Sequence, residues 1–260
     1  MKLTVAVLGL GEAGSAIARD LVARSVAVRG FDPVAAAPEG VAPAKDVADA
    51  VQGADVVLSV NAAAVALQVA GSAAPALRPG TLYADLNTGA PELKRSVAKP
   101  VEAAGAVFVD VALMAPVPGK GITTPALASG PGAQRFAEVF IPLGMPVKVV
   151  DDQAGSAASR KLLRSVVMKG MAAAIIEGLT AAQRQGCEEW YLEEVRSIFR
   201  NANEALVDRF INGSRKHAVR RAHEMRVVAE MLLANDVHPR ISLAAAEWLK
   251  ELASAQQSGH

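Results

Sequence analysis

Cysteine is almost absent from this chain of 260 residues, where Cys187 is the only one. A single cysteine excludes an intrachain disulfide and a cysteine-built zinc site, and it fits a protein of the reducing cytoplasm. No spacing of histidines and carboxylates indicates a metal site either, so we predict no bound metal.

Net charge and aromatic residues are also scarce. The 27 basic and 26 acidic residues leave a net charge of +1, and aromatics make up 4% of the chain. This balance gives no field that would attract nucleic acid or an anionic membrane. No apolar run is long enough for a transmembrane helix, and the opening MKLTVAVLGLGEAG is expected to enter the first strand without an export signal. We therefore expect a small-molecule substrate as the partner.

Short β-branched runs alternate with alanine-rich segments over the first part of the chain. The runs are LTVAVLGL, SVAVRGFD, ADVVLSV, GTLYADL, GAVFVDVAL, PALASG and PVKVVD. Nearly continuous apolar strands separated by crossover-length segments predict a parallel sheet covered by helices on both faces. Beyond Asp152 the pattern is helical, with breaks expected at Gly186, Gly213 and His238-Pro239. The predicted fold is α/β, a Rossmann-type doubly wound parallel sheet (1–151) followed by an all-α C-terminal domain (152–260).

The stretch GLGEAG follows the first strand and opens a helix, which is the setting of a dinucleotide-binding turn. Gly9 would permit the tight turn, Gly11 would let the pyrophosphate approach the backbone, and Gly14 would let the helix pack on the strand. Free amides at the helix start would bind the phosphates. The predicted turn thus runs through Gly9, Leu10, Gly11, Glu12, Ala13 and Gly14.

Asp32 ends the second predicted strand, where an acidic side chain can bind the adenosine ribose hydroxyls and repel a 2′-phosphate. We therefore predict NAD as the cofactor, preferred over NADP. Two alternatives stay open: Arg29 lies close by in the sequence and would favour NADP, and Asp32 could simply cap the following turn.

Four features of the chain follow the order seen in the β-hydroxyacid dehydrogenases, and the chain resembles that superfamily. They are GLGEAG, the loop after ADVVLSV, the stretch DLNTGAP and a helix that carries Lys161. Within this superfamily, the chain looks most like a branch of 6-phosphogluconate-dehydrogenase-like NAD-binding proteins. The stretches that resemble this branch are DVALMAPVPGKG, ASRKLLRSVVMKG and HAVRRAHEMRVVAEML. The resemblance implies that Val60, Asn61 and Ala62 lie along the cofactor, and that Asn87 and Thr88 border the nicotinamide.

Two departures from the superfamily pattern fall where the substrate is expected. Met114 replaces a carboxylate-binding serine, and Ser165 occupies the position of an asparagine. These changes and the apolar segment around Met114 argue against 6-phosphogluconate as the substrate. Substrate contacts are predicted for an apolar-rich set comprising Met114, Ala115, Pro116, Lys120 and Met168.

Lys161 and Ser165 share one face of a predicted helix, because residues i and i+4 do so. A lysine beside apolar residues can simply extend its ammonium into water. Gly155, however, matches the glycine that precedes the superfamily lysine, and the resemblance implies that Lys161 is the general acid/base, with Ser165 beside it. The predicted reaction is hydride transfer between NAD and a small hydroxy acid or alcohol. Imine reduction and a non-catalytic, cofactor-binding regulatory role remain alternatives, and the apolar C-terminal helices predict a homodimer.

Overall fold

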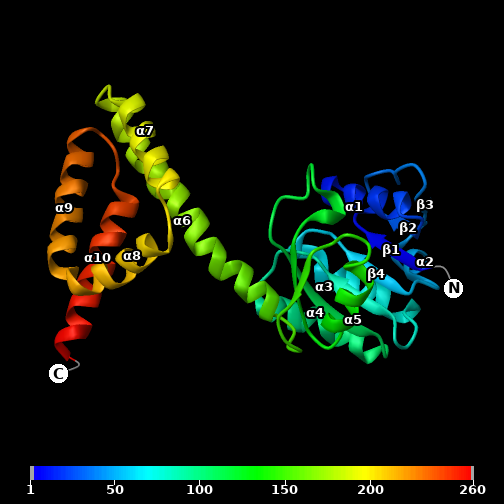
Figure 1. The fold of residues 1–260 in the computed structure, drawn as a ribbon. Helices are drawn as coiled ribbons and strands as arrows, with labels where there is room; N and C mark the ends of the chain where they lie inside the picture. The colour runs from blue at the N-terminus through cyan, green and yellow to red at the C-terminus, as the bar shows by residue number, and fades with distance from the viewer. Residues whose placement is uncertain (1–2, 259–260) are drawn as a thin grey trace. The chain divides into compact units, whose positions relative to one another are not determined.

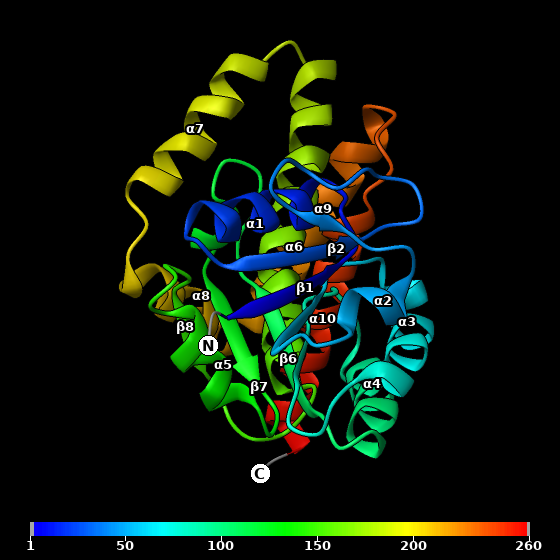
Figure 2. The ribbon, with the colours of Figure 1, turned by 90° about the vertical axis from the view of Figure 1, so that its right-hand side faces the viewer.

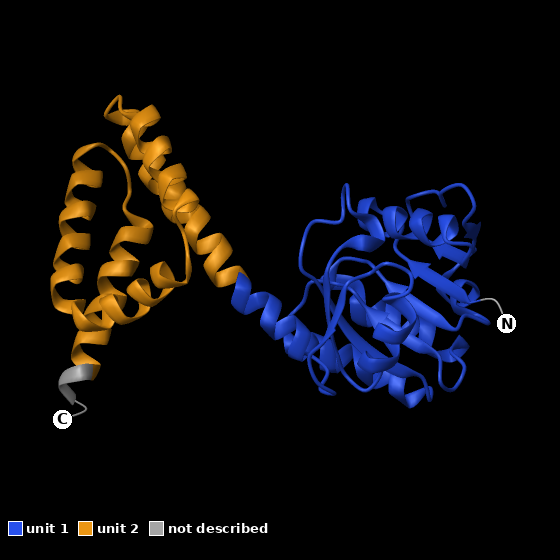
Figure 3. Ribbon diagram, in the orientation of Figure 1, with its two compact units in different colours: residues 1–164 blue, residues 165–260 orange. Residues whose placement is uncertain are grey.

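The computed structural model describes residues 3–258, which form two compact units (Figures 1 and 3). The first unit comprises residues 1–164 and the second residues 165–260. Strands end near residue 151 as predicted, but the units divide later, inside the long helix α6 (Ser156–Arg184). The first turns of α6 belong to the first unit because their backbone amides bond to its sheet, as described below.

The first unit is built on one eight-stranded sheet of order β3-β2-β1-β4-β5-β6-β7-β8. All seven predicted strands are present: β1 (Thr4–Leu8), β2 (Ala27–Phe31), β4 (Val56–Ser59), β5 (Leu82–Asp85), β6 (Val107–Leu113), β7 (Ala126–Ser129) and β8 (Val147–Val149). The sequence pattern missed β3 (Ala42–Pro43), which has two residues. The sheet is parallel as predicted except at one pairing, where β7 runs antiparallel to β6.

Helices cover both faces of this sheet (Figure 2). Alternate strand residues divide between two cores, as the period of two requires. Val5 and Val7 of β1 pack in one core with α1 (Glu12–Ala23) and α5 (Ala133–Phe140), whereas Ala6 and Leu8 pack in the other. The second core is completed by α2 (Val47–Val51), α3 (Ala66–Ala73) and α4 (Pro91–Ala103). Short 3-10 turns occupy Ala63–Val65, Ala74–Ala76 and Gly121–Thr123.

The second unit is entirely helical within the described residues. It contains the later part of α6 and then α7 (Glu188–Arg200), α8 (Glu204–Lys216), α9 (Ala218–Ala234) and α10 (Arg240–Ser258). Gly186 and His238-Pro239 separate helices as predicted, but Gly213 lies inside α8. The breaks lie instead at residues 201–203 and at His217, which separates α8 from α9. The side chain of Asn203 accepts a hydrogen bond from the amide of Leu206 and caps α8. None of the described helices is long and apolar enough to cross a membrane.

Candidate functional site

The glycine turn between β1 and α1 requires glycine at two positions for steric reasons. Gly9 has φ of +98°, and a Cβ added there would lie 2.3 Å from the carbonyl oxygen of Val60. A Cβ on Gly14 would lie 1.9 Å from the carbonyl oxygen of Gly9. A Cβ on Gly11 meets no atom within 4 Å, so the fold itself does not require glycine there. The open space at Gly11 fits the role of a position that a ligand approaches closely.

A cavity of about 370 Å³ lies over this turn. Its lining comes from the turn, from the loops after β4, β5 and β6, and from α6, and includes Gly11, Glu12, Ala13, Gly14, Val60, Asn61, Asn87, Thr88, Ala115 and Lys161. Residues predicted for the cofactor and for catalysis are thus brought together within the first unit. A helix N-terminus with amides facing open space suits a pyrophosphate.

A second, mostly apolar cavity of about 270 Å³ adjoins the first at Asn61, which lines both cavities. Gly9, Phe31, Pro33 and Val69 contribute to its wall. An apolar hollow beside the end of β2 suits an adenine ring, and the two cavities together fit a dinucleotide. The cofactor would supply the hydride-transferring ring, held by the residues around the glycine turn.

A buried polar row crosses the sheet at the edge that faces the glycine turn. Ser59, Asp85, Asp110 and Ser129 are register partners on β4, β5, β6 and β7. All four are buried, and beyond the first three the chain continues into the loops that line the cavity. The hydroxyl of Ser59 accepts hydrogen bonds from the side-chain amides of Asn61 (2.9 Å) and Asn87 (3.2 Å). The predicted cofactor loops are therefore joined to each other through this row.

Lys161 lies in the second turn of α6, and its ammonium donates a hydrogen bond to Thr88 Oγ1 over 2.9 Å. Gly155, just before α6, has φ of +99°, and a Cβ there would lie 2.9 Å from the carbonyl oxygen of Pro91. Glycine therefore allows the start of α6 to approach the start of α4. This approach brings Lys161 to the loop after β5.

Asp32 follows β2 directly, and its carboxylate accepts three backbone hydrogen bonds. They come from the amides of Leu10, Val34 and Ala35, each at 2.8 Å. Burial opposes ionisation, but the three amides outweigh it and lower the pKa of Asp32. Asp32 does cap the following turn, as the alternative interpretation held, and it is ionised at neutral pH beside the glycine turn. Arg29 is engaged elsewhere, by Asp49 at 2.8 Å.

Several predicted site residues do not line the cofactor cavity. The Leu10 side chain is buried in the core, and Ala62 precedes a 3-10 turn. Met114 bonds through its backbone to Pro125 and Arg164, whereas Pro116 and Lys120 lie outside the described cavities. Ser165 and Met168 belong to the part of α6 in the helical unit. The described residues contain no cluster of three or more histidine, cysteine or acidic side chains that could hold a metal.

Sequence reasoning missed a buried ion cluster formed by Asp85, Lys94 and Asp110. The Lys94 ammonium lies 3.0 Å from Asp85 Oδ2 and 3.2 Å from Asp110 Oδ1. Burial raises the pKa of Asp85, and the attraction of Lys94 opposes this shift. The register pairing of the two aspartates is the signal that could have revealed the cluster.

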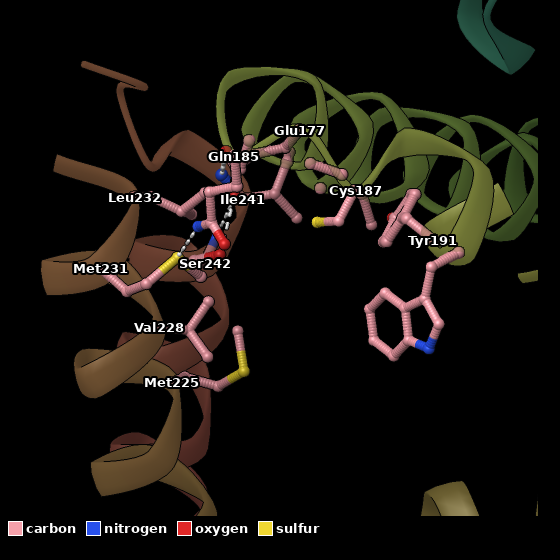
Figure 4. Close-up of a pocket in the computed structure, with 15 residues that line it drawn as sticks. Glu177, Gln185, Cys187, Tyr191, Met225, Val228, Met231, Leu232, Ile241 and Ser242 are labelled. Carbon is pink, nitrogen blue, oxygen red and sulfur yellow. Dashed lines mark hydrogen bonds between the residues drawn. The ribbon is translucent and has the colours of Figure 1, made fainter. Parts of the chain in front are cut away.

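The helical unit has its own pocket of about 320 Å³ (Figure 4). Trp190, Tyr191, Met225 and Leu232 give it a mostly apolar wall. Glu177 also lines it, but its carboxylate accepts hydrogen bonds from the amides of Ile241 (2.7 Å) and Ser242 (2.9 Å), so it caps α10.

The fold and the cavity define a nicotinamide-dinucleotide-binding protein of the oxidoreductase class. Residues 4–126 match the NAD binding domain of 6-phosphogluconate dehydrogenase, and residues 182–252 match a domain of unknown function, DUF1932. The chain belongs to the β-hydroxyacid dehydrogenase superfamily, as its sequence pattern predicted, and is an NAD(P)-dependent dehydrogenase or reductase.

Individual relatives cover most of the chain. A probable 3-hydroxyisobutyrate dehydrogenase of Mycobacterium bovis is 30% identical over 74% of this chain and 68% of its own length. A conserved hypothetical protein of Sinorhizobium meliloti is 34% identical, with a TM-score of 0.65 over 96% of this chain and 88% of that chain. The fold is also that of a Myxococcus stipitatus imine reductase variant in complex with NAD+, with TM-score 0.83 and 20% identity over 98% of this chain and 95% of that one.

Proposed function

We propose that this protein transfers hydride between NAD and a small hydroxy acid or alcohol, with Lys161 as the general acid/base. The observation that carries the proposal is the hydrogen bond of Lys161 to Thr88 in the cavity that also contains the glycine turn. An amine held there is placed to exchange a proton with a substrate oxygen while hydride moves between the substrate carbon and the cofactor.

The proton and the hydride balance in both directions. In oxidation, the neutral Lys161 amine would take the hydroxyl proton of the substrate, and the bound cofactor would accept the hydride of the carbinol carbon. In reduction, the ammonium would give a proton to the carbonyl oxygen, and the cofactor would supply the hydride to the carbonyl carbon. Thr88 keeps the lysine at the end of β5 through the 2.9 Å hydrogen bond.

The proposed preference for NAD rests on the charge of Asp32. Its carboxylate is ionised next to Leu10 and lies at the end of β2, where the ribose of the adenosine is expected. A 2′-phosphate would meet this negative charge, and the nearby Arg29 is already paired with Asp49. Both features disfavour NADP.

Imine reduction is the second candidate. The imine reductase fold extends over nearly the whole chain, and Met114 stands where a hydroxy-acid enzyme is expected to have a carboxylate-binding serine. A substrate without a carboxylate would not need that serine. A cofactor-binding regulatory protein is the third candidate, and it would turn over none of these substrates.

A homodimer in the cytoplasm is the proposed state of the protein. The buried core of the helical unit is small: Ala181, Leu232 and Val237 form its one cluster among the described residues, and its other buried apolar residues are alanines. Large exposed side chains on α7, α8 and α10 include Trp190, Phe199, Phe210, Ile211 and Trp248. Apolar surface of this extent on a small helical unit favours association with a second copy.

The test is a panel of hydroxy acids, alcohols and cyclic imines, each assayed with NAD(H) and NADP(H). Lys161→Met keeps the apolar stem and removes the proton donor, so turnover of the best substrate should fall by about 10²-fold with NADH affinity unchanged. Lys169→Met is the matched control, because it makes the same change further along the same helix. Wild-type turnover in Lys161→Met would show that the proton comes from another group.

A further inference from the structure

The buried ion cluster of Asp85, Lys94 and Asp110 lies beneath the candidate site. Each of the three side chains is at most 1% exposed. Asp85 ends β5, Asp110 belongs to β6, and Lys94 comes from the first turn of α4. Burying three charges is costly, and apolar groups of similar size would often stabilise a fold as well. The contacts of the cluster therefore need an explanation beyond stability.

One set of hydrogen bonds, the first arm of the cluster, connects it to the loop that carries Thr88. The Asp85 carboxylate accepts hydrogen bonds from both the backbone amide and the side-chain amide of Asn87, at 3.2 and 2.5 Å. The side-chain oxygen of Asn87 in turn accepts from the backbone amide of Asn61. Lys94 also donates to the carbonyl oxygen of Asp85 over 2.9 Å. The residue just before Thr88 is thus held at its backbone and its side chain.

The other arm reaches the first turn of α6. Asp110 Oδ2 accepts from the amide of Ala158 (2.9 Å) and from the hydroxyl of Ser129 (3.2 Å). Ser129 Oγ accepts from the amide of Ala157 (2.9 Å). Amides in the first turn of a helix have no partner within the helix, so these two acceptors cap α6. The Asp110 carboxylate also places negative charge at the N-terminal end of α6, which favours it.

Both arms converge on the hydrogen bond between Lys161 and Thr88. Ala158 is three residues before Lys161 and lies on the same side of α6. The connections form a closed ring from Lys94 through Asp85 and the loop of Thr88 to Lys161, and back through the start of α6 and Asp110. A displacement of either arm would change the position of the Lys161 amine relative to Thr88.

We infer that the Asp85–Lys94–Asp110 cluster is a positioning device, which holds Lys161 on Thr88 by fixing the loop after β5 and the start of α6 together. This inference rests on the proposed role of Lys161. Asp85, Lys94 and Asp110 are positioning residues, since they act through Lys161 and Thr88. An ion cluster suits this task because each charge can accept or donate in several fixed directions at once.

The test compares Asp110→Asn with Asp55→Asn. Asp110→Asn has almost the same shape, and Lys94 keeps its pair with Asp85. Asp55 is a matched control in the same unit, because its carboxylate also accepts from a backbone amide (Thr4, 2.9 Å) and pairs with a cation (Arg78, 3.5 Å), but it lies before β4 at the opposite end of the strand from Ser59. Thermal unfolding and NADH binding are measured for both variants.

With the best substrate of the panel, Asp110→Asn should lower kcat by about 10-fold or more without changing the affinity for NADH, whereas Asp55→Asn should leave kcat unchanged. In a Lys161→Met background, Asp110→Asn should have no further effect on kcat, because the two residues act as a unit. Equal losses of kcat in both backgrounds, or equal losses in both aspartate variants, would overturn the inference.

A second measurement does not depend on turnover. The rate at which acetic anhydride modifies Lys161 is measured by mass spectrometry, and it should rise in Asp110→Asn but not in Asp55→Asn, because Lys161 leaves Thr88. This comparison decides the positioning role even if Lys161 proves not to be catalytic. If Asp110→Asn does not fold, Ser129→Ala removes one cap of α6 and one hydrogen bond to Asp110 but keeps all three charged side chains of the ion cluster, and the same two results are expected. An unchanged modification rate in the folded variant would contradict the inference.

Discussion

Gly11→Ala should separate cofactor binding from folding. Gly11 is the N-cap of α1 with φ of −62°, which any L-residue adopts, and an added Cβ meets no atom within 4 Å. The substitution should therefore not strain the fold. It should even raise the free energy of unfolding slightly, by about 0.4 to 1 kcal/mol, because alanine restricts the unfolded chain.

Cofactor binding should respond differently, because the methyl group would project into the cavity over the turn. A pyrophosphate kept away from the amides loses one charge-assisted hydrogen bond, worth about 1.5 to 3 kcal/mol. We expect the Kd for NADH to rise about 10-fold to 100-fold. Titration of NADH fluorescence measures the affinity, and thermal unfolding measures the stability.

Gly14→Ala is the matched control, because the same methyl group would lie 1.9 Å from the carbonyl oxygen of Gly9. That contact involves backbone on both sides, so α1 must move, and a loss of stability of several kcal/mol is expected, in the range about 3 to 5 kcal/mol. Unaltered NADH affinity in Gly11→Ala would refute the assignment of this turn to the pyrophosphate. A destabilised Gly11→Ala would refute the steric argument instead.

Three further predictions concern charge and assembly. The wild-type protein should bind NADH about 5-fold to 150-fold more tightly than NADPH, and Asp32→Asn should reduce this ratio; equal wild-type affinities in calorimetry would contradict the ribose assignment. Light scattering at micromolar concentration should give the mass of a dimer, and a monomer would show that the apolar helical surface has another role. Glu177→Gln should lower the free energy of unfolding of the helical unit by about 1 to 2 kcal/mol in urea at pH 7, because a charged cap of α10 becomes neutral. Burial opposes ionisation of Glu177, but Ser242 and the α10 amides lower its pKa below 4.5. The stabilisation is therefore fully present above pH 4.5, and it disappears as the pH falls through the pKa of the folded state. A difference in stability between Glu177→Gln and the wild type that persists in acid would contradict this assignment.

The strands of the first unit could be predicted from the sequence because burial on both faces leaves an apolar run that few other segments have. The direction of β7 could not, since its run PALASG has the same composition whether its neighbour is parallel or antiparallel. The two-residue β3 is too short for any periodicity. In the helical unit, Gly213 predicts a break because glycine is a poor helix former, but α8 continues through it.

Some parts of the candidate site could be predicted from the local sequence and others could not, and the difference has a physical reason. The glycine turn is local, so that its residues and their spacing are read together in the sequence. The cofactor loops and Lys161 were placed by resemblance, because nothing in their local sequence shows that α6 returns to the end of β5. Lys94 was missed, since a lysine in PELKRSVAKPVEA looks like an ordinary exposed helical residue.

The aspartates on β5 and β6 nevertheless contain a signal that the sequence could have provided. ADL and VDV each place an acidic residue late in an otherwise apolar predicted strand, and such strands are buried on both faces. Neighbouring parallel strands bring these positions side by side, as the pairing of Asp85 with Asp110 shows. Two adjacent buried carboxylates cannot both stay ionised without a cation, and a basic residue on a helix that covers the sheet can supply one. The crossover between the two strands is α4, and Lys94 in its first turn lies closest in sequence to the end of β5. A buried acidic pair at strand ends therefore predicts a buried lysine or arginine early in the connecting helix, and in this chain that lysine lies under the candidate catalytic residue.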